Sequence, residues 1–167
     1  MTDVLDPLEG TIMKILFALC SISLAFGSVQ VWADGNKPNH AGHGEALGKP
    51  GDSAKVSRTI AVDMSDAMRF TPSNVRVNKG ETIRFVVRNS GRVKHEMVLG
   101  TTKELREHAQ LMKRFPEMEH QDPNQVSLEP GKSGELVWQF TRPGTVDFAC
   151  LQPGHFDAGM RGRIAVR

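Results

Sequence analysis

The stretch Cys150-Leu-Gln-Pro-Gly-His155-Phe-Asp-Ala-Gly-Met160 decides how this chain can fold. It carries a thiol, an imidazole and a thioether at intervals of five residues. The segments on either side, residues 144–150 and 161–167, have the composition of short strands. A Pro-Gly pair inside the stretch favours a bend between them. The sequence therefore predicts a tight loop, joining two neighbouring strands, that aims three side chains at one point.

These donors are typical of one kind of metal site. Thiolate, imidazole and a weak thioether hold copper in mononuclear electron-transfer sites, where a second histidine completes a trigonal plane. The second histidine must come from upstream, and His95 is the natural candidate at the start of a predicted strand. The spacing C-x4-H-x4-M is specific in this strand–loop–strand setting and weak outside it.

Other interpretations of the same residues remain open. Cys150 could be a buried small apolar side chain, or it could form a nucleophilic pair with His155. Five residues across a strand end is an unusual spacing for such a pair, and no oxyanion machinery accompanies it. The chain also lacks the His-x-His pairs of multicopper oxidases, a Gly-x-Ser-x-Gly elbow and a Gly-rich phosphate loop. We therefore expect a protein that is not an enzyme.

Residues 1–33 have the pattern of a secretory signal peptide. Met13 and a lysine precede an apolar run at residues 15–26, and a cleavage site is expected after Ala33. Residues 1–12 are acidic, unlike the start of a signal, so Met13 is the expected true start. The apolar run is short for a membrane span. We expect export to the periplasm and no membrane insertion after cleavage.

The cysteine count and the net charge indicate which kinds of partner the protein can bind. The chain has two cysteines, and Cys20 lies in the predicted signal, so the exported protein would hold Cys150 alone. An unpaired thiol in an exported protein is a liability unless a metal occupies it. The net charge of +2 is too small to indicate nucleic-acid binding, although a mildly basic domain favours acidic protein partners.

Residues 34–56 are rich in glycine, proline and small polar residues, which predicts a flexible arm. His40 and His43 in this arm could hold a metal loosely. A solvated tether is the simpler interpretation of the same composition.

Residues 57–167 carry the pattern of an all-β domain with one helical insertion. Short segments of strand composition alternate with turn signals, which predicts an antiparallel sandwich or barrel. The expected strands cover residues 57–63, 69–77 with a break at Pro72, 81–88, 94–99, 125–128, 135–140, 144–150 and 161–167.

The insertion covers residues 101–115, where the hydrophobic period changes to that of a helix. Thr101 and Glu104 are placed to form a capping box, and Pro116 ends the helix. The side chains expected on its buried face are Leu105, Ala109, Met112 and Phe115.

Several residues outside the loop could also bind copper. Thioethers select Cu(I), so Met64, Met68 and Met118 could form an auxiliary copper surface, although core packing is the simpler interpretation. Met97 shares one side of its strand with His95 and could line the copper pocket or pack beside it.

We expect three further polar side chains to face solvent, namely His108, His120 and Asp147.

The residues together resemble a known family. The pattern Phe70-x-Pro72 … Val77-x-x-Gly80 … Phe85 … His95 … Cys150-x4-His155-x4-Met160-x-Gly162 looks like that of the cupredoxins, the small blue-copper proteins. The resemblance spans about residues 57–167 and is greatest to the periplasmic copper-resistance cupredoxins of the CopI type. It implies a cupredoxin-like Greek-key β-sandwich that binds one Cu(I)/Cu(II) ion. The implied ligands are His95, Cys150, His155 and Met160.

The resemblance has one departure. Many cupredoxins follow the first ligand histidine with an asparagine or serine that braces the two ligand loops, and Glu96 stands in that place here. The sequence therefore does not predict how the two ligand loops are braced against each other.

Two functions fit this pattern. One is periplasmic copper tolerance, in which the protein binds, buffers or passes on copper; the alternative is electron transfer to an oxidase or reductase. We expect a monomer that meets a redox or copper-transfer partner transiently. The expected docking site is an apolar patch of Leu151, Pro153 and Phe156 around His155, which is expected near the surface.

Overall fold

The computed structural model describes residues 48–118 and 121–167. The predicted signal peptide, most of the predicted arm with His40 and His43, and His120 lie outside the described residues.

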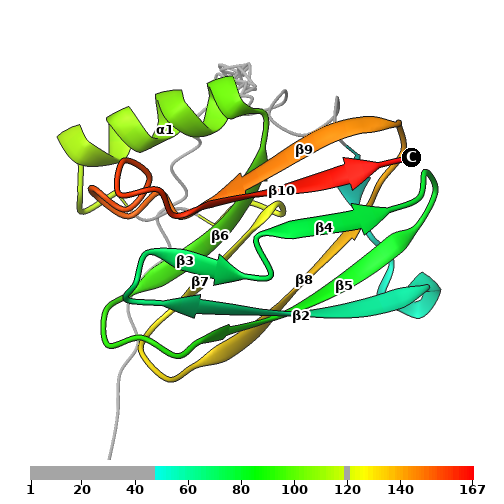
Figure 1. Ribbon diagram of the computed structural model, residues 1–167, viewed down its shortest axis with the longest axis horizontal. Coiled ribbons are helices and arrows are strands. Elements are labelled where there is room, and N and C mark those ends of the chain that lie inside the picture. Colours follow the sequence, from blue (N-terminus) through cyan, green and yellow to red (C-terminus); the bar gives the residue numbers. More distant parts are fainter. Residues whose placement is uncertain (1–47, 119–120) are drawn as a thin grey trace, which may run out of the picture. The chain divides into compact units, whose positions relative to one another are not determined.

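The strands form two five-stranded sheets (Figure 1). The first sheet has the order β1 (Lys49–Pro50), β8 (Ser133–Gln139), β5 (Thr82–Asn89), β2 (Arg58–Ser65), β3 (Arg69–Thr71). The second has the order β4 (Asn74–Val77), β10 (Arg161–Val166), β9 (Gly144–Ala149), β6 (His95–Gly100), β7 (Gln125–Leu128).

Both sheets bury their facing side chains in one hydrophobic core, as strands with alternating apolar residues should. On β5, Ile83, Phe85 and Val87 are fully buried. Across the core, the rings of Phe70 and Phe148 meet edge to face with centroids 4.9 Å apart. The predicted all-β sandwich is confirmed.

Two strand pairs differ from the antiparallel pattern expected from sequence. β2 pairs with β5 in parallel, and β4 pairs with β10 in parallel. A tight hairpin forces antiparallel pairing, but neither pair is joined by one. Between β2 and β5 the chain first forms β3 and then crosses to the second sheet at Pro72, the predicted break. Such a crossover lets the next strand of the first sheet run in the same direction.

The predicted helix is α1 (Thr102–Arg114), and its N-terminus carries the predicted capping box between Thr101 and Glu104. Leu105, Ala109 and Met112 are buried as expected. Phe115 is not: it is the C-cap, with φ −132°, and is 53% exposed. Because the helix ends there, the 3.6-residue period no longer carries that side chain to the buried face.

None of the helices within residues 48–118 and 121–167 has the length and apolar character needed to cross a membrane.

The first sheet begins inside the stretch expected to be a flexible arm. β1 pairs antiparallel with β8, and the Gly51 amide donates to the Val137 carbonyl at 2.9 Å. A short 3-10 helix, Ser53–Lys55, follows and is capped by Asp52. These contacts cover the backbone edge that β8 would otherwise expose.

Candidate metal centre

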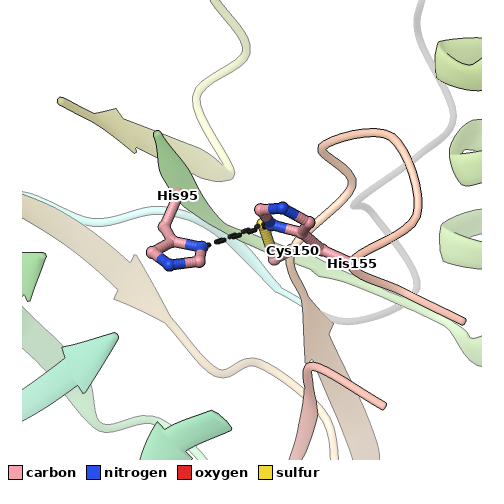
Figure 2. Close-up of side chains that lie close together, drawn as sticks. All are labelled: His95, Cys150 and His155. Atoms are coloured by element: carbon pink, nitrogen blue, oxygen red, sulfur yellow. Dashed lines mark hydrogen bonds between the residues drawn. The ribbon is translucent and has the colours of Figure 1, made fainter. Parts of the chain in front are cut away.

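Three of the four predicted ligands converge at one end of the second sheet. His95 is the first residue of β6, Cys150 follows directly after β9, and His155 lies in the loop that leads to β10. Figure 2 shows the three side chains pointing toward one another. His95 and Cys150 are fully buried, and His155 is half-buried.

The ligand atoms of these residues have the spacing that a trigonal metal ion requires. Nδ1 of His95 lies 3.2 Å from Nδ1 of His155, and Cys150 Sγ lies 3.9 Å and 3.2 Å from these two atoms. Bonds of about 2.0 Å to nitrogen and 2.3 Å to sulfur, spread at 120°, would separate nitrogens by about 3.5 Å and nitrogen from sulfur by about 3.7 Å. The donor set therefore fits one ion bound between a thiolate and two imidazoles.

Met160 closes the base of the loop. The Cys150 amide donates to the Met160 carbonyl at 3.1 Å, and the Met160 amide donates to the His155 carbonyl at 3.0 Å. The Met160 side chain is fully buried in the same core cluster as Cys150. The backbone turns required for this closure use left-handed conformations at Gly154 and Gly159, with φ of 86° and 91°.

Burial sets the protonation of the two loop ligands in the metal-free protein. Desolvation raises the pKa of the Cys150 thiol to about 12, and the nearby Glu96 carboxylate acts in the same direction. Desolvation, with His95 close by, lowers the pKa of His155. The imidazole is thus a neutral lone-pair donor at pH 7, while a metal must displace the thiol proton to bind.

The sequence itself places the chain in a family. Residues 54–167 match the model of the copper binding proteins of the plastocyanin/azurin family. The chain belongs to this family. Its domain is thus a copper-binding domain, and copper is the metal that the trigonal site accommodates.

Similar proteins agree with this assignment. The chain is 57% identical to a copper-resistant cuproprotein CopI of Rubrivivax gelatinosus over 72% of this chain and 73% of that one. It is 38% identical to a CopI of Pseudomonas aeruginosa over 75% of this chain and 84% of that one. The fold also resembles the auracyanin of Roseiflexus castenholzii, with a TM-score of 0.58 and 22% identity over 67% of this chain and 98% of that one.

Glu96 directly follows His95, and its side chain braces the segments that carry His95 and Cys150. Its buried carboxylate accepts from the Leu151 amide at 3.0 Å and from the Gln152 side-chain amide at 3.3 Å. The Glu96 amide in turn donates to Cys150 Sγ at 3.5 Å. The strand that carries His95 is therefore tied to the loop that carries Cys150, by a carboxylate instead of a neutral side chain.

Asp66 is a site residue that sequence reasoning missed. Its Oδ1 lies 3.2 Å from Nε2 of His95, a contact between residues 29 apart in the chain. The Arg92 amide donates to both carboxylate oxygens of Asp66, and this bonding lowers the pKa of that carboxyl. Asp66 lies in the turn between β2 and β3, and no motif there could have indicated the contact.

The expected apolar patch around His155 is not present. Leu151 and Phe156 are only 1% and 6% exposed, because α1 lies alongside the ligand loop and covers them (Figure 1). They form a second hydrophobic cluster with Leu105, Ala109 and other side chains. Pro153 alone of the three patch residues is exposed. The helix expected as an insertion therefore packs on the loop that carries Cys150 and His155.

The other candidates separate by burial. Met64 and Met97 are fully buried in the main core, so Met64 cannot belong to a copper-loading surface. Met68 packs against that core, whereas Met118 is exposed. Within the described residues, His95, Cys150 and His155 are the one group of three His, Cys, Asp or Glu side chains close enough to share an ion.

Two of the three polar side chains expected to face solvent can be located. His108 is half-buried on α1. The Asp147 side chain is only 17% exposed, because Thr102 donates to it at the start of α1 and Arg163 donates to it from β10.

Proposed function

We propose that this protein is an exported copper-tolerance protein that holds a single copper ion through His95, Cys150, His155 and Met160. The proposal depends on one observation. The Nδ1 atoms of His95 and His155 and the Cys150 sulfur lie 3.2–3.9 Å from one another. The 57% identity to a copper-resistant cuproprotein supports tolerance as the biological role.

Each of the four residues would have a distinct role in copper binding. Cys150 would give up its proton on metal binding and supply the thiolate, which is the strongest donor to soft Cu(I). His95 and His155 would each supply an Nδ1 lone pair, and Met160 would supply a weak fourth donor. Such a donor set would favour one-electron exchange with little change in geometry. If Met160 fills the fourth position, no position would be open for a substrate, so we propose a binding protein and not an enzyme.

We further propose that the protein works in the periplasm after removal of residues 1–33, as the signal-like composition of that segment indicates. Half-buried His155 would be the route by which electrons or copper reach a transient protein partner. The same half-buried position also suits the alternative function, an electron shuttle to an oxidase or reductase.

Copper binding is tested on the purified exported protein with added Cu(II). We expect one copper per chain and a strong thiolate-to-Cu(II) charge-transfer band. Cys150→Ser should remove the band while far-UV circular dichroism stays unchanged. Met160→Leu should keep the band but raise the reduction potential, since a weak donor to Cu(II) is lost. A band that survives Cys150→Ser would refute the assignment of the thiolate.

Tolerance and electron transfer are separated by growth. A deletion strain should grow normally without added copper and fail as copper rises, and a strain carrying Cys150→Ser should fail equally. An electron shuttle instead predicts a respiratory defect at ordinary copper. Growth across a copper series at constant oxygen distinguishes the two, and a respiratory defect with unchanged copper sensitivity would favour the shuttle.

A further inference from the structure

Asp66 contacts the ring nitrogen of His95 that points away from the thiol. Nδ1 of His95 faces Cys150 and His155, while Nε2 lies 3.2 Å from Oδ1 of Asp66. The two nitrogens of this imidazole are therefore committed to different partners, one to the metal position and one to a carboxylate.

This contact determines where the imidazole carries its proton. An ionised carboxylate only accepts hydrogen bonds, so Nε2 of His95 must be the donor. A neutral imidazole with its proton on Nε2 leaves the lone pair on Nδ1. That lone pair points to the position between Cys150 and His155, as metal ligation requires.

The residues around Asp66 hold its carboxylate in place and leave room for it beside His95. The Arg92 amide donates to Oδ1 at 3.0 Å and to Oδ2 at 2.9 Å, which holds the carboxylate in place. Gly91 provides the space: a Cβ there would lie 2.1 Å from Asp66 Oδ1 and 3.1 Å from His95 Nε2. Any side chain at Gly91 would therefore push the carboxylate away from the ring.

We propose that Asp66 is a positioning residue of the copper site, which fixes the tautomer and orientation of His95 and makes the site favour Cu(II) over Cu(I). A carboxylate on the far nitrogen raises the basicity of a ligating imidazole. Its negative charge also stabilises the doubly charged ion more than the singly charged one. The inference rests on the proposed function only through the assignment of His95 as a ligand.

The tautomer is tested in the metal-free protein by long-range ¹H–¹⁵N NMR of the histidine rings. We expect the neutral form of the His95 ring in the wild type to carry its proton on Nε2. Asp66→Ala should give a mixture of tautomers, and Gly91→Ala should act in the same way by displacing the carboxylate. A neutral His95 ring with its proton on Nδ1 in the wild type, or an unaltered tautomer in Asp66→Ala, would overturn the positioning role.

The bias between oxidation states is tested by the reduction potential and by the affinities for Cu(I) and Cu(II). Asp66→Asn keeps an oxygen that can accept from Nε2 but removes the charge, so the potential should rise. Loss of an outer partner of a metal-bound histidine typically costs about 10- to 100-fold in affinity. A tenfold loss confined to Cu(II) corresponds to about 59 mV for one electron.

Asp157→Asn is the matched control, because Asp157 is a carboxylate of the ligand loop that pairs with Lys113 and not with a ligand. We expect it to leave the potential and the tautomer unchanged. Equal shifts in Asp66→Asn and Asp157→Asn would overturn the specific role of Asp66. A wild type that binds no copper would refute the proposed function, and with it the bias toward Cu(II), while the tautomer result would stand.

Discussion

Burial works against the thiolate of Cys150 in the metal-free protein. With a pKa of about 12, roughly one thiol in ten thousand is ionised at pH 8, compared with about a quarter for an ordinary cysteine. Because the thiolate is the reactive form, we predict that iodoacetamide labels the folded protein at least about a hundredfold more slowly than the urea-unfolded protein. The labelling rate should still rise above about pH 9.5, where an ordinary thiol levels off.

The rate is measured by mass spectrometry of the metal-free protein between pH 7 and 10. The chain unfolded in urea provides the control, since its thiol is fully exposed. Rapid labelling of the folded protein at pH 8 would contradict both the burial and the raised pKa of Cys150.

Glu96 offers a second prediction for a single residue. Glu96→Ala leaves the Leu151 amide without its acceptor, and a buried unpaired donor costs about 1–3 kcal/mol. We expect the free energy of unfolding in urea to fall by that amount in the metal-free protein. Glu96→Gln retains a carbonyl oxygen for the amide and should lose less. Glu107→Ala, an exposed acid on α1, is the control, and an equal loss there would argue against the brace.

Site residues that lie close together in the sequence could be predicted, whereas a contact between distant segments could not. Cys150, His155 and Met160 were predictable because one loop holds them, and His95 because it begins a strand. Asp66 was not, because its contact with His95 depends on the β2–β3 turn lying beside the start of β6. That the ligating role falls to these four residues stays a prediction until copper binding is measured.

At the scale of elements, the helix shows how far periodicity reaches. The capping box and the 3.6-residue spacing predicted where α1 (Thr102–Arg114) begins and which side chains it buries. They could not say what those side chains pack against. The structure places Leu105 and Ala109 in one cluster with Leu151 and Phe156 of the ligand loop. Consequently the two apolar loop residues expected at the surface are buried.

This packing leads to a prediction with a matched pair on one helix. Leu105 is 3% exposed and Leu111 is 40% exposed. Leu105→Ala should lower the free energy of unfolding by about 2–5 kcal/mol, because it leaves a cavity beside the ligand loop. Leu111→Ala removes the same atoms from a largely exposed position and should cost well under about 1 kcal/mol. Urea denaturation of the metal-free variants measures both free energies of unfolding. Similar losses of stability in the two variants would show that the packing of Leu105 against the ligand loop does not stabilise α1.

At the scale of the whole molecule, the strand pattern predicted a sandwich but not its pairing. Alternation states which face of a strand is buried, and it is silent about which strand lies beside it. The parallel pairs β2–β5 and β4–β10 arise because the chain changes sheets at Pro72, a crossover that turn signals alone do not reveal.

The start of the domain leads to the last prediction. Sequence composition put the boundary at residue 57, yet Lys49–Pro50 pairs with β8 and the Gly51 amide bonds to the Val137 carbonyl. A chain of residues 57–167 would leave that edge of β8 unpaired, and an open edge invites association with other chains. We predict that residues 48–167 unfold in urea with the same free energy as residues 34–167. Residues 57–167 should be less stable and should elute from size-exclusion columns as larger species with rising concentration. Equal stability and a monomeric state for all three chains would mean that β1 is dispensable and that the domain begins at residue 57.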